Sequence, residues 1–321
     1  MRVTLIVNPV ASSVTRRTRI VIQKALTSDH ELNVEETTRK GQAIRLAHRA
    51  ARTGAEVVIA LGGDGTINEV ANGTLGESCW VAPLPGGSTN VFARAIGYPN
   101  DAVEATDTLL AALTAGSVTK ASVGLANNRA FLFHLGAGFD AAVVERVERR
   151  GQLKRYFGYP WFIASTFAAW FEEITGSGSS FTIEAADGRR VAGARLAIAM
   201  NTTPYTYLGA NALHLAPEAG LDQPLAIATL TSLSPRMVPI LVAATKRARG
   251  LPTVAGAHHW SDVDKAIITA KQPFLYQLDG EAMDPVTELQ LDHYPAALNM
   301  VVPVAPLSNR GPPPATDNAA S

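Results

Sequence analysis

Short apolar runs alternate with segments of helical periodicity over the first 122 residues. Apolar runs at residues 3–7, 32–36, 57–61 and 80–84 predict strands, and apolar spacing over 16–26, 42–53 and 101–115 predicts helices. Strands and helices that alternate in this way form a parallel sheet with helices on its faces. We therefore expect a doubly wound α/β domain over residues 1–122, with its loops gathered at the carboxyl ends of the strands.

The pattern changes after residue 122, where short strands separated by Gly, Pro and Asn dominate. These runs lie at residues 130–135, 181–185, 191–200, 225–230, 266–270, 274–278 and 298–302. They predict a mainly antiparallel β-sandwich domain over 123–305, with helical inserts in pieces over 141–171 and at 237–249. Residues 306–321 are rich in Pro, Ala, Ser and Asn, which predicts a disordered tail.

Composition excludes several classes of protein. The chain has 28 Lys+Arg and 28 Asp+Glu, so it lacks the positive excess that unaided nucleic-acid binding requires. Cys79 is the single cysteine, which excludes an internal disulfide framework and a thiolate zinc cage. The longest apolar run, residues 161–171, is too short for a spanning helix, which needs about 20 residues. These features predict a soluble, cytoplasmic protein.

Two glycine loops follow neighbouring predicted strands. The first, LGGDGTINE, covers residues 61–69, and the second, LPGGSTNVFAR, covers 84–94. Glycines let the backbone approach a ligand closely, and N–H groups at a helix start favour an anion, so the loops predict a phosphate site. A tight turn capped by Asp64 and Thr66 is the structural alternative for the first loop. Neither GxxxxGK[ST] nor GxGxxG is present, which argues against a Walker site and against an ordinary dehydrogenase.

The sequence resembles a known family over most of its length. The segments that carry the resemblance are VNPVAS, ETTRKGQAIRLAHRAARTGAEVVIALGG, GGDGTINEVANG, PLPGGSTNVFARAIGYP and LDGE. Together they are similar to the diacylglycerol kinase catalytic family, which includes bacterial lipid kinases and sphingosine-kinase-like enzymes. The resemblance implies an α/β nucleotide-binding domain followed by a β-sandwich. It also implies ATP and Mg²⁺ as cofactors and transfer of the γ-phosphoryl of ATP to a hydroxyl of diacylglycerol or a related lipid.

The resemblance also implies roles for particular residues. It assigns Asp64 to the Mg·ATP network and Glu281 as the acceptor of the lipid hydroxyl's proton. The implied nucleotide contacts are Asn8, Pro9, Ser12, Thr37, Gly62, Gly63, Asp64, Gly65, Thr66, Asn68, Glu69, Gly87, Ser88 and Asn90. Without the family, Asp279-Gly280-Glu281 is a plain hairpin turn, because Asp-Gly is the strongest signal for one.

Three departures from the family pattern concern polar groups of the site. Ser12 replaces the glycine that closes the first loop, and Val91 replaces an acid in the second glycine loop. In the implied second-domain metal element, Gly220, Asp222, Gln223 and Leu225, the usual aspartate falls on Gln223. Either Asp222 takes over through a shifted turn, or that Mg²⁺ site is lost, because Mg²⁺ prefers hard oxygen ligands with at least one carboxylate.

An aromatic and basic segment predicts contact with a membrane. Eight aromatic residues lie between 156 and 171, directly after a stretch, 145–155, with five basic and two acidic residues. This pairing favours docking at an anionic membrane surface, and hence peripheral association with a lipid substrate. The alternative is a helix that packs its aromatics on the sandwich. Bacterial members of the family suggest a homodimer.

Three functions remain after these considerations. The first is an ATP-dependent lipid kinase. The second is an NAD kinase-like phosphotransferase, which shares GGDGT and a sandwich domain. The third is a non-catalytic nucleotide or lipid sensor that lost turnover through Val91 and Gln223. His258-His259 is expected in a loop or at a strand edge and not in a metal site.

Overall fold

The computed structural model describes residues 1–139, 141–142, 180–232 and 256–304. Apart from 141–142, the expected inserts at 141–171 and 237–249 lie outside these residues, as does the aromatic and basic segment at 145–171. The expected tail at 306–321 also lies outside them, so all these expectations stay predictions.

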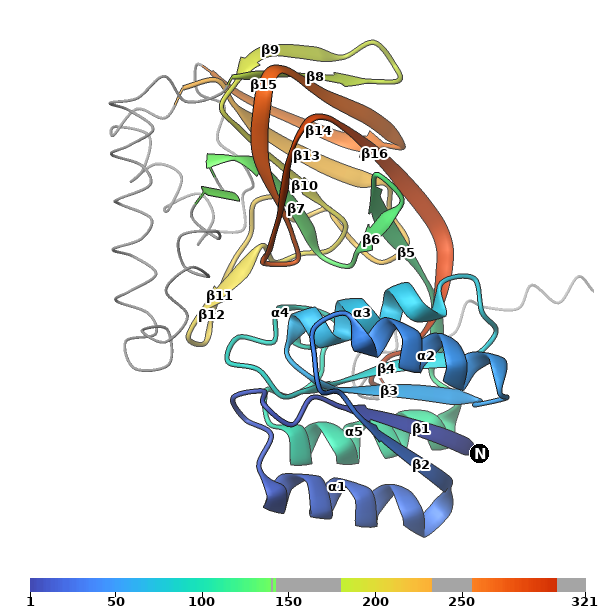
Figure 1. The fold of residues 1–321 in the computed structure, drawn as a ribbon. Helices are drawn as coiled ribbons and strands as arrows, with labels where there is room; N and C mark the ends of the chain where they lie inside the picture. The colour runs from blue at the N-terminus through green and yellow to red at the C-terminus, as the bar shows by residue number, and fades with distance from the viewer. Residues whose placement is uncertain (140, 143–179, 233–255, 305–321) are drawn as a thin grey trace, which may run out of the picture.

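The first part of the chain forms a parallel sheet with helices on both faces (Figure 1). Its strands, in the order β2–β1–β3–β4, are β1 (Arg2–Val7), β2 (Glu31–Glu36), β3 (Val57–Gly62) and β4 (Trp80–Pro85). Its helices are α1 (Arg16–Asp29), α2 (Gln42–Arg52), α3 (Asp64–Thr74), α4 (Val91–Ala95) and α5 (Ala102–Ala115). Because α1 and α5 lie on one face and α2 and α3 on the other, the predicted doubly wound α/β layer is confirmed.

Local sequence explains where these elements begin and how deeply they lie. All six residues of β3, VVIALG, are buried, since the strand lies inside the sheet with helices on both sides. At the start of α1 the Thr15 hydroxyl accepts the Thr18 N–H, and at the start of α5 the Asp101 carboxylate accepts the N–H groups of Val103 and Glu104. These side chains satisfy N–H groups that have no partner within the helix.

The remaining strands form a mainly antiparallel region. They are β5 (Val118–Ala126), β6 (Arg129–Phe131), β7 (His134–Gly138), β8 (Phe181–Ala185), β9 (Arg190–Ala194), β10 (Leu196–Met200), β11 (Thr206–Leu208), β12 (Asn211–Leu213), β13 (Leu225–Leu230), β14 (Ala257–Val263), β15 (Lys265–Leu278) and β16 (Glu281–Val301). The predicted, mainly antiparallel second region is confirmed. All except β11 and β12 belong to one hydrogen-bonded sheet, which β16 joins to β4 in parallel through Asn299 and Met300.

Three predicted strand boundaries in this region were wrong: two runs are divided where the chain changes hydrogen-bonding partners, and two others are joined because both pair with β16. The run at 191–200 is interrupted at Arg195, because β9 pairs with β8 whereas β10 pairs with β7 and β13. The run at 130–135 is divided into β6 and β7. The runs at 266–270 and 274–278 form the single strand β15, across a register shift that accommodates the polar residues between them.

Two large hydrophobic cores follow this division. The first lies on both faces of the parallel sheet and includes Leu298, Met300 and Val301 from the end of β16. The second lies against the antiparallel strands and includes Phe181 and Phe274. The predicted domain division at residue 122 stays a prediction. In the described ranges, no helix combines the length and the apolar character needed to cross a bilayer.

Gly73 sets how closely α2 and α3 approach. A Cβ at Gly73 would lie 2.3 Å from the Ile44 carbonyl oxygen and 2.8 Å from the Ala47 Cβ. Overpacking of this kind costs about 1–3 kcal/mol, which outweighs the roughly 1 kcal/mol by which alanine favours a helix over glycine. We expect Gly73→Ala to lower the free energy of unfolding by about 1–2 kcal/mol in urea denaturation. Gly65→Ala is the control on the same helix, where the added Cβ meets nothing within 4 Å. Equal stability of the two variants would contradict this packing role.

Candidate active site

The two glycine loops lie against each other at the carboxyl ends of β3 and β4. The Gly86 N–H donates to the Gly62 carbonyl oxygen at 2.7 Å. A Cβ on Gly87 would lie 2.8 Å from the Gly63 Cα, so any larger residue would push the loops apart. The strand order therefore brings the predicted phosphate loops to one rim, as the sequence predicted.

The loop after β1 joins this rim. The Asn8 side-chain amide donates to the Thr66 hydroxyl at 3.0 Å. From the same loop, the Ser13 N–H donates to the Gly86 carbonyl and its hydroxyl to the Gly87 carbonyl. Pro9 is half-buried and Ser12 is exposed. These contacts bring Asn8 and Ser13 to the glycine loops.

Asp64 connects the two glycine loops. Its two carboxylate oxygens accept the N–H groups of Val91 at 2.9 Å and Phe92 at 3.0 Å, which begin α4. Burial raises the pKa of the Asp64 carboxyl, and the two backbone hydrogen bonds oppose that effect. The carboxylate therefore has a structural role here, and its predicted place in a Mg·ATP network stays a prediction.

Asn90 and Ser88 occupy the second glycine loop in different ways. Asn90 is buried with φ of 51°, and its side chain closes the loop by accepting from the Gly87 N–H and donating to the Gly87 carbonyl. Ser88 is exposed. Thr37, after β2, is buried and donates its N–H to the Val7 carbonyl. Of these predicted contacts, Ser88 is the one that faces solvent.

Asn68 and Glu69 hold other elements in place. The Glu69 carboxylate accepts the N–H groups of Gly41 at 2.7 Å and Ala43 at 2.9 Å, and so caps α2, whose own N-cap is a glycine without a side chain. The Asn68 amide donates to the Ala130 carbonyl and to the Asp279 carboxylate. Both side chains are buried, and their predicted nucleotide contact stays a prediction.

Glu281 lies directly after the turn between β15 and β16. Asp279 and Gly280 both have positive φ, as a type I′ hairpin requires, so the turn expected as the alternative exists and also positions Glu281. The Glu281 side chain is 12% exposed, and each of its oxygens faces a cation. Lys40, from the loop before α2, forms an ion pair with Oε1, and Arg129 Nη2 donates to Oε2 at 3.0 Å. Sequence reasoning missed both cations, because the pairs join residues far apart in the chain.

Asp279 is a buried carboxylate that the sequence analysis left without a role. It is 5% exposed and accepts the N–H groups of Leu132, Phe133 and His134 at 2.7–3.1 Å, and the Asn68 amide at 2.8 Å. Burial raises the pKa of the Asp279 carboxyl from 3.8 to about 6, while the hydrogen bonds oppose that rise. The carboxylate thereby fixes the β6–β7 connection and α3 relative to the turn that carries Glu281.

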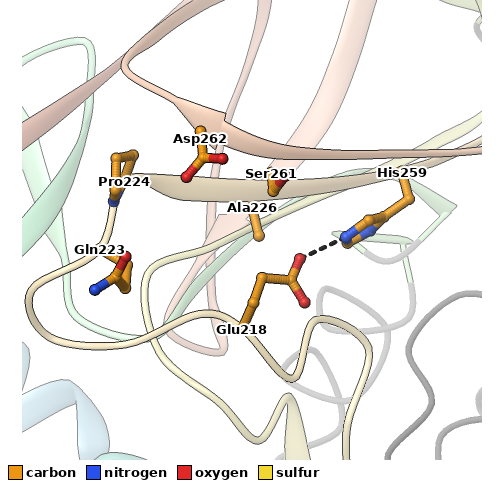
Figure 2. Close-up of a pocket in the computed structure, with 7 residues that line it drawn as sticks. All are labelled: Glu218, Gln223, Pro224, Ala226, His259, Ser261 and Asp262. Atoms are coloured by element: carbon orange, nitrogen blue, oxygen red, sulfur yellow. Dashed lines mark hydrogen bonds and ion pairs between the residues drawn. The ribbon is translucent and has the colours of Figure 1, made fainter.

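The predicted second-domain metal element runs beside a pocket of about 300 Å³. Figure 2 shows Glu218 pointing toward His259 of β14, with Gln223 and Asp262 on other sides of the pocket. His258 and His259 lie on β14, which ends the path of the large sheet, as expected for a strand edge. His259 is paired with Glu218.

The donor groups of this element do not form a Mg²⁺ cage. Asp222 is its single carboxylate and is exposed, and the Gly220 carbonyl already accepts the Gln223 N–H. Leu225 belongs to β13. Within the described ranges, no group of three His, Cys, Asp or Glu side chains is placed to hold a metal ion.

The first part of the chain is similar to known proteins. Residues 2–126 match the diacylglycerol kinase catalytic domain. Over 121 residues the chain is 37% identical to a diacylglycerol kinase of Bacillus subtilis (strain 168), which covers 37% of this chain and 39% of that protein. It is 38% identical over 111 residues to a diacylglycerol kinase of Staphylococcus aureus (strain Newman), 34% of each chain. The matched region thus spans little more than a third of these relatives.

Solved structures share the fold over nearly the whole chain. A diacylglycerol kinase from Bacillus anthracis str. Sterne has a TM-score of 0.69 at 20% identity and covers 94% of this chain and 96% of its own. An NAD kinase from Archaeoglobus fulgidus in complex with ATP has a TM-score of 0.50 at 13% identity, covering 93% of each chain. The chain therefore has the fold that these solved structures share. Residues 2–126 are similar to the diacylglycerol kinase catalytic domain.

Proposed function

We propose that this protein is a lipid kinase that transfers the γ-phosphoryl of ATP to a hydroxyl of diacylglycerol or a related lipid. The observation that supports the proposal most directly is the position of Glu281. The hairpin that carries it is linked through Asp279 to Asn68 in α3, the helix that begins at the glycine loop. This link supports a place for the Glu281 carboxylate near the glycine loop that begins α3.

The proposed step needs little covalent chemistry from the protein. A carboxylate oxygen of Glu281 accepts a hydrogen bond from the lipid hydroxyl. It takes the hydroxyl proton as the hydroxyl oxygen of the lipid attacks the γ-phosphorus. The new O–P bond forms while the bond between the γ-phosphorus and its bridging oxygen breaks, and ADP leaves with that bond's electron pair. The glycine loops bind the phosphates through backbone N–H groups.

Mg²⁺ enters this proposal as the partner of ATP. Such a site commonly takes one or two carboxylates together with substrate phosphates, and Asp64 is the carboxylate within the glycine loops. When bound, the ion neutralises phosphate charge. Asp64 itself orients α4 against the first glycine loop.

A transfer assay with several acceptors tests the proposed function. Purified protein is incubated with radiolabelled ATP, Mg²⁺ and detergent micelles that contain diacylglycerol, monoacylglycerol, ceramide or a sphingoid base. A parallel reaction contains NAD. We expect label in an organic-extractable product. Label in NADP alone would overturn the lipid assignment in favour of the NAD kinase-like alternative, and ATP binding without transfer to any acceptor would favour the sensor.

Membrane association is part of the same proposal. The supporting segments at 145–155 and 156–171 lie outside the described residues, so the sequence alone carries this part. Replacing Arg149, Arg150, Lys154 and Arg155 by Ser is expected to weaken binding to anionic vesicles.

A further inference from the structure

Lys40 forms an ion pair across the two parts of the protein. It lies between β2 and α2 in the α/β layer, whereas its partner Glu281 begins β16. The Lys40 side chain is 68% exposed and the Glu281 side chain 12%. A long exposed side chain that contacts a mostly buried carboxylate keeps the freedom to reach a ligand beside that carboxylate.

The three loops that form the phosphate rim supply no positive side chain of their own. The loops at residues 8–15, 62–65 and 86–90 contain no Lys or Arg. Arg94, in α4, is committed elsewhere: its guanidinium lies 3.5 Å from the Tyr207 ring centroid and donates to the carbonyls of Thr89 and Gly209. A triphosphate carries several negative charges, and a cation at the transferred group stabilises the charge spread over its oxygens.

The position of Glu281 sets the distance over which the Lys40 ammonium must reach the γ-phosphoryl group of ATP. If Glu281 accepts the proton of the lipid hydroxyl, that oxygen lies about 2.6–3.2 Å from the carboxylate. In a reactive arrangement the phosphorus lies about 3–3.5 Å from the same oxygen. The Lys40 ammonium contacts the same carboxylate, so a γ-phosphoryl group in this arrangement would lie within reach of the Lys40 side chain.

We propose that Lys40 is a further catalytic residue, which contacts the γ-phosphoryl group of ATP and neutralises its charge during transfer. This inference rests on the proposed function of Glu281 as proton acceptor. It assigns Lys40 two partners in turn: Glu281 without nucleotide, and the γ-phosphoryl group when ATP is bound. Arg129 remains on the other oxygen of Glu281 throughout.

Nucleotide binding gives the first test, because it needs no lipid. Isothermal titration measures the affinities of wild type and Lys40→Met for ADP and for the non-hydrolysable β,γ-imido analogue of ATP, both with Mg²⁺. A direct contact with the γ-phosphate predicts that the preference for the ATP analogue over ADP falls about tenfold in Lys40→Met, while ADP affinity is unchanged. A simple tether between the two parts of the protein would leave that ratio unchanged, which would overturn the proposal.

Two variants serve as matched controls. Arg39→Met removes a positive charge from the neighbouring position of the same loop. Lys265→Met removes a lysine of similar exposure, 71%, that is also paired with a carboxylate, Asp292. Both are expected to keep the wild-type ratio, and an equal fall in Arg39→Met would show that general loop charge, and not Lys40, is responsible.

Turnover gives the second test. With lipid acceptor, Lys40→Met is expected to lower kcat about 100-fold, and Lys40→Arg is expected to recover part of that loss because it restores the charge. Wild-type kcat in Lys40→Met would overturn the proposal. A wild-type protein that phosphorylates no lipid would instead overturn the proposed function, and the binding ratio would still decide whether Lys40 contacts the γ-phosphate.

Discussion

Glu281→Gln is expected to lower phosphoryl transfer to lipid by about 10³-fold, a typical contribution of a positioned proton acceptor. The glutamine amide keeps one acceptor oxygen for a cationic donor, turns its NH2 group toward the other, and has no basic group that takes the hydroxyl proton. Nucleotide affinity is expected to stay within about twofold of wild type, because Glu281 lies on the hairpin and not in the glycine loops. Initial rates with radiolabelled ATP and titration with the β,γ-imido analogue measure the two quantities.

Glu288→Gln is the matched control for this experiment. Glu288 lies on the same strand, β16, and is exposed. The same chemical change there is expected to leave the rate unaltered. Substantial transfer by Glu281→Gln would remove Glu281 from the role of proton acceptor and with it the main support for the proposed chemistry.

The sequence predicted the parallel layer more closely than the antiparallel one, for a physical reason. Strands such as β3 are apolar at every position because helices cover both faces of the sheet, so burial alone marks them. β16 could not be predicted in this way. Its residues 281–297 mix polar and apolar positions without a regular alternation and include Pro285 and Pro295, and pairing with β15 and β5 holds much of this stretch in a strand.

In the candidate site, too, local sequence patterns reveal only part of the arrangement. The glycine loops, Asn8 and Glu281 could be predicted because short motifs mark them. Lys40, Arg129 and Asp279 act through partners from 145 to more than 200 positions away, so no local pattern reveals them. Asp279 had one signal, its place in LDGE before a turn glycine, but the hairpin signal accounted for it without a buried role.

Asp279→Ala is expected to destabilise the fold strongly. The change removes the acceptor of four buried donors: the N–H groups of Leu132, Phe133 and His134, and the Asn68 amide. Each buried donor left without an acceptor costs about 1–3 kcal/mol, and the relief of a buried charge offsets part of the sum. We expect the free energy of unfolding at neutral pH to fall by about 3 kcal/mol in urea denaturation.

Asp262→Ala separates this effect from backbone strain. Asp262 also has positive φ, 55°, but is exposed, so its replacement by alanine carries the left-handed strain without the loss of buried acceptors. It is expected to cost about 1 kcal/mol or less. If Asp279→Ala cost no more than Asp262→Ala, the four hydrogen bonds would not stabilise the hairpin against α3.

The contribution of Asp279 to the free energy of unfolding is expected to fall as the pH rises. Its folded-state pKa of about 6 exceeds the ordinary value of 3.8, so the folded state binds more protons between these values. The stability that this group contributes is complete below pH 3.8 and is lost as the pH rises through about 6. From about pH 4 to about pH 7 the loss amounts to at most about 3 kcal/mol.

Asp279→Asn does not titrate, and its amide oxygen and tolerance of positive φ preserve the turn. The stability difference between wild type and Asp279→Asn should therefore change across this range, and a constant difference would show that Asp279 does not titrate there.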